Sequence, residues 1–277
     1  MRTTKLPNGE AVPVLGLGTW MMGEKASLRA AEIAALKLGL DLGMTLIDTA
    51  EMYGDGGAEE IVAEAIKGRR DETFIVSKVL PSNASARGTV AACERSLKRL
   101  RTDRIDLYLL HWRGNFALQE TIDAFHALRA QGKIRHWGVS NFDLADMEEL
   151  MACDGGTDVA SNQVLYNPQR RGIDFDLAPW SRQHAIPIMA YSPVEQGRLL
   201  KHSALLKIAE RHGASAAQVC LAWAMRDRAT IAIPKGTDPA HVRDNRAAHD
   251  LTMTPDDLAD IDRAFPPPTR AKPLEMI

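Results

Sequence analysis

Eight short runs of apolar, strand-forming residues recur along this chain of 277 residues, and stretches with helical spacing separate them. The runs cover residues 14–17, 46–47, 74–76, 105–110, 134–139, 159–164, 186–190 and 230–233. After the first run, Ile33, Leu36 and Leu40 lie three and four residues apart, as on one face of a helix. Strand-then-helix repetition favours parallel strands joined by right-handed crossovers. Eight repeats in about 250 residues therefore predict an α/β fold, a closed (β/α)₈ TIM barrel rather than an open doubly wound sheet.

Further elements are predicted at the two ends of the chain. Asn8 and Gly9, flanked by Leu6 and Val12, are a strong signal for a two-residue hairpin turn. We expect this N-terminal β-hairpin to close the barrel floor, and a last helix to span residues 254–265. Gly43 follows the first helical stretch, where a left-handed helix C-cap is expected. Because no Pro- or Ser-rich linker divides the chain, we expect one domain over residues 1–277.

The charge balance and the cysteines exclude several classes of partner. Lys and Arg number 34 against 36 Asp and Glu, so the net charge of −2 gives no broad attraction for nucleic acid or an anionic membrane. The three cysteines lie far apart, which leaves neither a disulfide framework nor a Cys-x-x-Cys metal motif. No stretch approaches the roughly 18 apolar residues of a membrane span, and the N-terminus lacks a leader-like apolar run. We expect a cytoplasmic monomer without a nucleic-acid or membrane partner.

Polar and ionisable residues follow the predicted strands one after another. They are Asp48, Lys78, His111, Ser140 with Asn141, Tyr191 and Lys235. In a (β/α)₈ barrel the carboxyl ends of the strands converge on one face, where active sites are built. The sequence therefore predicts a single polar site at this end of the barrel.

Motifs in the same order along nearly the whole chain resemble those of aldo-keto reductases. They occupy residues 16–20, 48–54, 75–78, 105–112, 132–142, 162–163, 190–193 and 233–235. The ordered set is specific, whereas a single motif such as Ser140-Asn141 is weak. The chain is most similar to short-looped bacterial members, including methylglyoxal-type and diketogluconate-type reductases. The fold that this resemblance implies is the barrel that periodicity predicts independently.

The resemblance implies a catalytic tetrad of Asp48, Tyr53, Lys78 and His111. Reducing a carbonyl requires a hydride, which a nicotinamide cofactor supplies, and a proton donor at the carbonyl oxygen. Tyr53 would be this acid, and the Lys78 ammonium would lower the pKa of the phenol from its usual value of about 10. Asp48 would hold Lys78 in place, and His111 would orient the substrate carbonyl by a hydrogen bond.

The resemblance also implies a set of cofactor contacts along the barrel rim. These are Thr19, Trp20, Asp48, Ser140, Asn141, Gln163, Tyr191, Ser192, Lys235, Gly236, Thr237, His241 and Asn245. Many NADPH-dependent members have a serine in place of Gly236 and an arginine in place of His241, and arginine is the better phosphate ligand. Since Lys235 is present, we expect NADPH as the preferred cofactor, with NADH possible.

The substrate pocket is expected to be small and open. Trp20, Met52 and Trp112 are predicted to form its apolar walls, while the loops over residues 113–116 and 194–203 are short. Arg113 stands where a proline is common in the family. This pattern favours small aldehydes, such as 2-oxoaldehydes, which would be reduced to alcohols. A cofactor-sensing binding protein on the same barrel is the alternative. A metal-dependent hydrolase is disfavoured and no metal is expected, because no His-x-His ends a strand and Lys78 would repel a cation.

Overall fold

The computed structural model describes residues 1–227 and 229–277, and a parallel sheet forms its centre. The described strands of this sheet are β3 (Leu17–Gly18), β4 (Leu46–Asp48), β5 (Phe74–Val79), β6 (Ile105–Leu110), β7 (Ile134–Ser140), β8 (Asn162–Leu165), β9 (Ile188–Tyr191) and β10 (Thr230–Ala232). They lie side by side in chain order from β3 to β10. The sheet closes on itself, because the Gly18 amide donates to the Pro234 carbonyl at 2.9 Å and the Ala232 amide donates to the Val14 carbonyl at 2.8 Å. The predicted (β/α)₈ barrel is confirmed.

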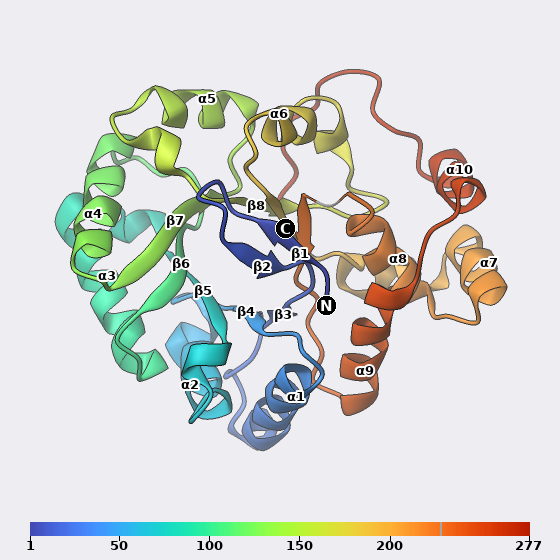
Figure 1. The fold of residues 1–277 in the computed structure, drawn as a ribbon, viewed down its shortest axis with the longest axis horizontal. Helices are drawn as coiled ribbons and strands as arrows, with labels where there is room; N and C mark the ends of the chain where they lie inside the picture. Colours follow the sequence, from blue (N-terminus) through green and yellow to red (C-terminus); the bar gives the residue numbers. More distant parts are fainter. Residues whose placement is uncertain (228) are drawn as a thin grey trace.

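The helices surround this barrel as an outer ring, which Figure 1 shows in projection. The described helices are α1 (Arg29–Asp41), α2 (Gly57–Ala65), α3 (Ala86–Leu100), α4 (Leu118–Ala130), α5 (Leu144–Ala152), α6 (Leu177–Gln183), α7 (Ser203–His212), α8 (Ala216–Ala224), α9 (Pro239–Ala247) and α10 (Pro255–Ala264). Short 3₁₀ turns are η1 (Ala26–Leu28), η2 (Tyr53–Gly56), η3 (Arg70–Glu72), η4 (Pro81–Asn83), η5 (Gly156–Asp158), η6 (Gly172–Asp174), η7 (Glu195–Lys201) and η8 (Ala248–Asp250). Helices α7 and α10 are additions to the repeat of one helix per strand, and they contact each other.

Local signals at helix ends act as the sequence predicts. Gly43 adopts a left-handed conformation with φ of +86° just after α1, which suits a residue without a side chain. The side chain of Thr254 accepts a hydrogen bond from the Asp257 amide at 3.2 Å and caps the start of α10. The predicted final helix is therefore confirmed to within one residue at each end.

Seven of the eight described strands of the barrel differ from their predicted bounds, and three of them differ by three residues at one end. The first is shorter than residues 14–17, because Leu15 pairs with Ala232 only as an isolated bridge before β3 begins. The sixth, β8, begins later than residue 159. The third, β5, continues beyond residue 76 to Val79, so that Lys78 lies inside the strand and is fully buried. Lys78 thus belongs to the barrel wall rather than to the loop after it.

The N-terminal hairpin closes one end of the barrel. Strands β1 (Thr3–Lys5) and β2 (Ala11–Pro13) pair antiparallel, and Gly9 in the turn between them has φ of +90°. Leu6 and Val12 are buried against apolar side chains of the barrel interior. In Figure 1 the hairpin lies across the middle of the ring of strands. The predicted hairpin floor is confirmed.

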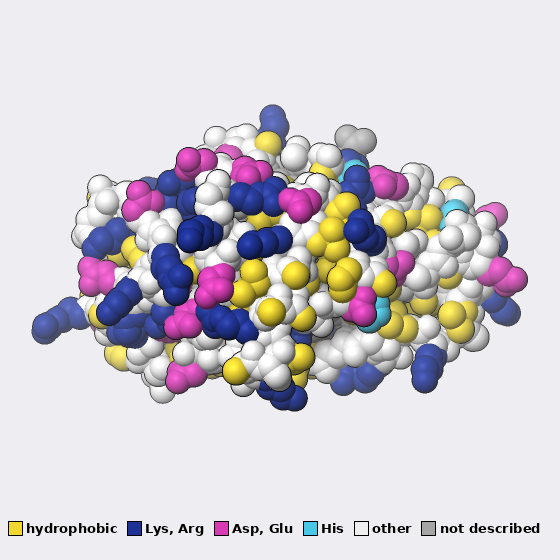
Figure 2. Space-filling view, turned by 90° about the horizontal axis from the view of Figure 1, so that it is seen from below, with side chains coloured by type: hydrophobic (Ala, Val, Ile, Leu, Met, Phe, Trp, Pro, Cys, Tyr) yellow, Lys and Arg dark blue, Asp and Glu magenta, His cyan; other side chains and the backbone are white. Residues whose placement is uncertain are grey.

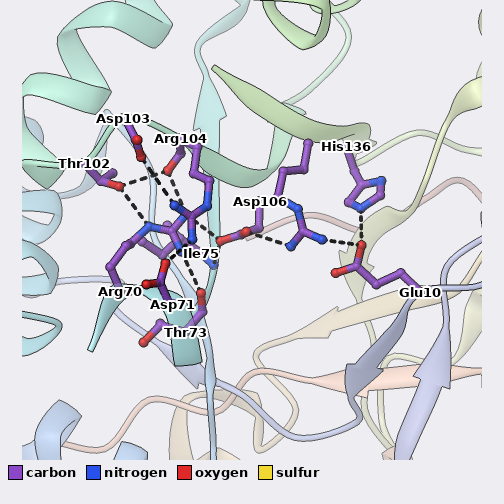
Figure 3. Close-up of polar contacts among 11 residues, drawn as sticks. Glu10, Arg70, Asp71, Thr73, Ile75, Thr102, Asp103, Arg104, Asp106 and His136 are labelled. Atoms are coloured by element: carbon purple, nitrogen blue, oxygen red, sulfur yellow. Dashed lines mark hydrogen bonds and ion pairs between the residues drawn. The ribbon is translucent and has the colours of Figure 1, made fainter. Parts of the chain in front are cut away.

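A network of charged residues connects this hairpin to the neighbouring barrel strands (Figure 3). Asp106, at the start of β6, is 2% exposed and lies 2.8 Å from an Arg70 nitrogen and 3.0 Å from an Arg135 nitrogen. A second nitrogen of Arg135 lies 2.7 Å from the Glu10 carboxylate of the hairpin, which also contacts His136 Nε2 at 2.8 Å. We call these five residues the floor network. It joins the hairpin to strands β6 and β7 through charged groups.

The outer surface carries both signs of charge. Figure 2 shows Lys and Arg side chains intermixed with Asp and Glu on one face, with hydrophobic side chains between them. This mixture agrees with the near balance of 34 basic and 36 acidic residues. None of the described helices has both the length and the apolar character that crossing a membrane requires.

Candidate active site

A cavity of about 590 Å³ opens at the carboxyl ends of the barrel strands. Three of the four predicted catalytic residues, Asp48, Tyr53 and His111, line it, and Lys78 lies buried behind them. The structure therefore brings together the polar strand ends that the sequence predicts. Across the described part of the chain, no three His, Cys, Asp or Glu side chains gather in an arrangement that would hold a metal ion.

Asp48 and Lys78 form a buried ion pair beneath the cavity. Lys78 Nζ donates to Asp48 Oδ1 at 2.8 Å, to Oδ2 at 2.9 Å and to the Thr49 carbonyl at 2.8 Å. Burial lowers the pKa of Lys78 and raises the pKa of Asp48, while the opposite charge of each partner resists that change. The ammonium is held at three acceptors and has little freedom to move, as the predicted anchoring role of Asp48 requires.

The Tyr53 hydroxyl lies 3.3 Å from Lys78 Nζ, and that nitrogen is 4.8 Å from the centre of the tyrosine ring. Burial, together with the negative charge of Asp48, raises the pKa of Tyr53 well above its usual value. The prediction that Lys78 lowers this pKa is wrong for this structure, because burial, and after it the charge of Asp48, raises the pKa. Tyr53 therefore remains a protonated phenol near neutral pH, which is the form that donates a proton.

His111 is a neutral imidazole at the edge of the cavity. Burial and the charge of Lys78 lower its pKa to about 2. The His111 ring packs edge-on against Tyr53 with 5.8 Å between ring centres. Its buried Nδ1 has no hydrogen-bond partner among the described residues. A neutral ring of this kind donates one N–H hydrogen bond without carrying charge, which suits the predicted contact to a carbonyl oxygen.

Ser140, Asn141, Gln163 and Tyr191 meet at one side of the cavity, where the family resemblance expects a nicotinamide carboxamide. Gln163 Nε2 donates to Asp48 Oδ1 at 2.7 Å, and Tyr191 OH donates to Asn141 Oδ1 at 2.9 Å. Within the described residues, no hydrogen bond uses Gln163 Oε1, so this oxygen is free to accept from an amide N–H. The side chains therefore offer a hydrogen-bond acceptor and a flat aromatic ring, and these two groups fit a nicotinamide carboxamide and its ring.

Thr19, Trp20 and Ser192 occupy different positions around this site. Thr19 is fully buried outside the cavity, and its hydroxyl donates to the Asp48 carbonyl at 2.9 Å. Trp20 and Ser192 line the cavity, and Ser192 accepts a hydrogen bond at its carbonyl from Asn167 Nδ2 at 3.0 Å. In this structure Thr19 supports Asp48, while the other two are positioned to touch a ligand.

The predicted adenosine-side residues extend from the cavity along α9. Lys235 lines the cavity, whereas Gly236, Thr237, His241 and Asn245 lie beyond its edge. His241 is exposed on α9, and Asn245 is buried at 7% exposure. The structure therefore groups these residues next to Lys235 without placing all of them at the cavity wall.

Two carboxylates act on Lys235. Burial lowers the pKa of the Lys235 ammonium, while the charges of Glu32 and Glu24 raise it. The Glu32 carboxylate is itself buried and accepts a hydrogen bond from the Gly23 amide at 3.0 Å. Negative charge close to Lys235 weakens the attraction that this lysine exerts on a phosphate.

The substrate side of the cavity has apolar walls. Trp20 is 41% exposed and Met52 is 40% exposed, and both line the cavity with Trp112. Met276 and Ile277 line it as well, which the sequence does not predict. An extended tail has no sequence periodicity that would predict where it packs. Because this tail covers part of the cavity, the lengths of the loops alone overestimate how open the pocket is.

The short loop after β6 is organised by Arg113. Its guanidinium donates to the Gly114 carbonyl at 2.8 Å and to the Phe116 carbonyl at 2.9 Å, and it contacts the Glu149 carboxylate at 3.1 Å. The residue that replaces the common proline therefore holds the loop by hydrogen bonds instead of by a restricted backbone.

Glu51 is a supporting residue that sequence reasoning missed. It lies between Asp48 and Tyr53 in the chain, and Oε1 accepts from the Leu80 amide at 2.8 Å and from Asn83 Nδ2 at 2.9 Å. These bonds join the segment that carries Tyr53 to the loop after β5. The only signal in the sequence is a carboxylate within the tetrad motif itself.

A closed parallel barrel with an Asp, a Tyr, a Lys and a His around one cavity defines a class of oxidoreductases. The Aldo/keto reductase family matches residues 14–265, and the chain belongs to this family.

Comparison with individual proteins narrows the position within the family. The chain is 52% identical over 272 residues to the methylglyoxal reductase YeaE of Escherichia coli strain K12, covering 96% of each chain. It is 36% identical over 263 residues to the glyoxal reductase of Bacillus subtilis strain 168, covering 94% of this chain and 91% of that one. The structure matches an aldo/keto reductase from Klebsiella pneumoniae in complex with NADP and acetate, with a TM-score of 0.98, 49% identity, and coverage of 100% and 99%.

Proposed function

We propose that this chain is an NADPH-preferring carbonyl reductase that converts small 2-oxoaldehydes to alcohols. The observation that carries the proposal is the Tyr53 hydroxyl at the cavity wall, 3.3 Å from Lys78 Nζ. Support comes from relatives named as methylglyoxal and glyoxal reductases and from similar structures that contain NADP or NADPH. These reductase names do not favour the alternative of a cofactor-sensing binding protein.

The residues of this chain perform the binding and proton-transfer parts of the reaction. A reduced nicotinamide supplies the hydride when it is bound. Tyr53 donates its proton to the carbonyl oxygen, and the neutral His111 orients that oxygen by a hydrogen bond. Lys78 lies close enough to stabilise negative charge that develops on the Tyr53 oxygen, and Asp48 keeps the ammonium in position. Ser140, Asn141, Gln163 and Tyr191 would hold the nicotinamide ring beside this acid.

Cofactor preference follows from the charges near Lys235. An ammonium attracts the extra phosphate of NADPH, which NADH lacks. Glu32 and Glu24 oppose this attraction, and the exposed His241 is a weaker phosphate ligand than arginine. We therefore expect NADPH to be preferred over NADH by a modest factor, about tenfold.

Substrate preference follows from the size and lining of the cavity. A 2-oxoaldehyde is already electrophilic, so that Tyr53 and His111 need little additional binding energy to reduce it. The walls of Trp20, Met52 and Trp112 offer contacts to a small apolar group but few polar groups that would select a particular substrate. A KM at the loose end of the usual range, about 1 mM, is expected.

Steady-state oxidation of NADPH tests this function directly. Methylglyoxal should be reduced with saturation kinetics, with a higher kcat/KM than a simple aliphatic ketone or a steroid ketone. The same panel with NADH measures cofactor preference. Tight turnover of the steroid with little activity on methylglyoxal would contradict the substrate class, and no oxidation with any carbonyl would contradict the reductase itself.

Three further expectations from the sequence stay predictions. They are a single domain over residues 1–277, a monomeric state and a cytoplasmic location. Light scattering of the purified chain measures the second of these.

A further inference from the structure

The turn over residues 192–197, directly after β9, has a backbone that requires external support. Ser192, Glu195 and Gln196 have φ of +47°, +50° and +54°, and Gly197 has φ of +86°. Residues other than glycine rarely adopt this left-handed conformation, and they persist in it only where surrounding contacts enforce it. Ser192, Gln196 and Gly197 line the cavity, so the shape of this turn sets one wall of the site.

Glu195 provides that support from behind the wall. Its side chain is 1% exposed and does not line the cavity. Glu195 Oε2 accepts from Asn167 Nδ2 at 2.8 Å, and Oε1 accepts from Arg198 at 2.9 Å and from Arg170 Nε at 3.2 Å. Asn167 Nδ2 also donates to the Ser192 carbonyl at 3.0 Å. One amide group therefore connects the start of the strained turn, at Ser192, to the Glu195 side chain.

The charge of Glu195 is stable in this position. Burial alone would raise the pKa of the Glu195 carboxyl, but the hydrogen bonds from Asn167, Arg198 and Arg170 outweigh burial and hold that pKa below its usual value. The carboxylate is therefore ionised near neutral pH, and its bonds to the two arginines are charge-assisted.

Arg170 extends the contact to the C-terminal segment. While its Nε donates to Glu195, its Nη1 donates to Glu275 at 2.5 Å. Glu275 directly precedes Met276 and Ile277, which line the substrate side of the cavity. One guanidinium thus joins the turn after β9 to the C-terminal segment.

We propose that Glu195 is a positioning residue that holds the turn over residues 192–197 in its ligand-binding shape and, through Arg170, couples this turn to the segment ending at Ile277. The proposal rests on the proposed function only in placing the cofactor beside this turn. Through this connection, the cofactor side and the substrate side of the cavity are held as one unit.

Glu195→Gln tests the proposal, because glutamine keeps the size of the side chain and removes its charge. We expect the Kd for NADPH, measured by quenching of tryptophan fluorescence, to rise about tenfold. We also expect trypsin to cut faster after Arg198, because the released turn becomes accessible. Glu195→Asp keeps the charge and should retain more of the affinity than the glutamine variant.

Two matched variants distinguish coupling between the turn and the C-terminal segment from a general loss of NADPH affinity. Arg198→Gln removes a partner of the same carboxylate whose side chain is 56% exposed, and the Kd should change less than about twofold. Glu275→Gln removes only the link to the tail. It should raise the Kd about threefold in the original chain and produce no further rise when Glu195→Gln is already present, as expected for groups joined through Arg170.

The outcomes distinguish this proposal from the proposed function. An unchanged Kd with unchanged trypsin cleavage in a folded Glu195→Gln variant would overturn the positioning role. If the original chain itself does not bind NADPH, the proposed function fails, and the trypsin comparison alone decides the role of Glu195. If Glu195→Gln does not fold, Arg170→Gln leaves the carboxylate bonded to Asn167 and Arg198, and it should show faster cleavage and an approximately threefold higher Kd. If Arg170→Gln shows neither faster cleavage nor a higher Kd, the proposal is contradicted.

Discussion

The two ends of the barrel each contain a buried aspartate beside a cation, and the surroundings of the two groups differ. At the floor, Asp106 lies between Arg70 and Arg135, away from the cavity. At the mouth, Asp48 binds Lys78 and lines the cavity of about 590 Å³. The same type of charge pair serves structure in one place and, in the proposed function, chemistry in the other.

The difference lies in the polar groups that remain available. Asp106 also accepts from the Ile75 amide at 2.8 Å, so that its oxygens are used within the protein. At the mouth, the buried His111 Nδ1 lacks a partner among the described residues, and the Tyr53 hydroxyl lies at the cavity wall. Polar groups that are not fully satisfied, with shifted pKa values, are typical of functional sites, whereas fully paired groups mainly stabilise the fold.

The largest expected effect is on activity at the mouth. Tyr53→Phe removes only the proton donor, and kcat should fall by about 10²–10⁴. Because the phenyl ring still fills the same space, the melting temperature and the Kd for NADPH should barely change. Steady-state kinetics with methylglyoxal, together with a thermal melt, measures this. Near-normal turnover in the folded variant would show that Tyr53 is not the acid.

The corresponding change at the floor should act on stability instead. Asp106→Ala leaves Arg70 and Arg135 without their carboxylate, and unfolding free energy should fall by about 3 kcal/mol. For a chain of this size the melting temperature should fall by roughly 8 °C.

Activity provides the control for this floor variant. At a temperature where Asp106→Ala is folded, kcat/KM should stay close to that of the original chain. A large loss of activity without a loss of stability would remove the distinction between the two ends.

Variants of Lys235 and His241 test how the cavity end of the barrel distinguishes NADPH from NADH. Lys235→Ala should raise the Kd for NADPH about tenfold and change the Kd for NADH less than about twofold, because only NADPH carries the additional phosphate. His241→Arg should lower the Kd for NADPH. Fluorescence titration with both cofactors measures these effects. Equal losses for the two cofactors in Lys235→Ala would show that Lys235 does not contact the phosphate.

A smaller effect is expected where the hairpin joins the floor network. Glu10→Gln weakens contacts to Arg135 and His136 that are partly open to solvent, with 24% of the Glu10 side chain and 43% of the Arg135 side chain exposed. Unfolding free energy should fall by at most about 1 kcal/mol. Urea denaturation at equilibrium measures the change. A loss as large as that of Asp106→Ala would show that the hairpin contact, rather than the buried aspartate, dominates the network.

The smallest expected effect is that of pH on kcat. Burial and the charge of Lys78 lower the pKa of His111 to about 2, so the imidazole is neutral throughout the range near neutral pH. The pKa of Tyr53 is raised well above its usual range, so the phenol stays protonated until alkaline pH. Between about pH 6 and about pH 9, kcat for reduction should vary less than about twofold. A rate that changes with an apparent pKa near 6.5 would contradict the neutral state of His111.

The sequence predicts those parts of the molecule that depend on local pattern. The alternation of runs predicts the barrel, Asn8 and Gly9 predict the hairpin, and the strand ends at Asp48 and His111 predict where the cavity opens. Each of these signals lies within a few neighbouring residues, and the closed barrel then fixes how the strand ends meet.

What the sequence does not predict depends on residues that meet only in space. The reversed pKa shift of Tyr53 results from burial and from the charge of Asp48. The position of Met276 and Ile277 at the cavity depends on how an extended segment packs, for which no periodicity exists. The contact from Thr19 to the Asp48 carbonyl likewise follows from the relative placement of two strands.

Arg113 has a consequence for the evolution of substrate range. Because its guanidinium binds carbonyls of its own loop and a carboxylate on α5, Arg113 stabilises the conformation of the loop after β6. His111 is fixed separately by the strand ladder, since its amide donates to the Val79 carbonyl at 3.0 Å. Substitutions within this loop are therefore expected to leave the backbone position of His111 unchanged, so that the loop can vary in sequence while the proposed catalytic imidazole keeps its place.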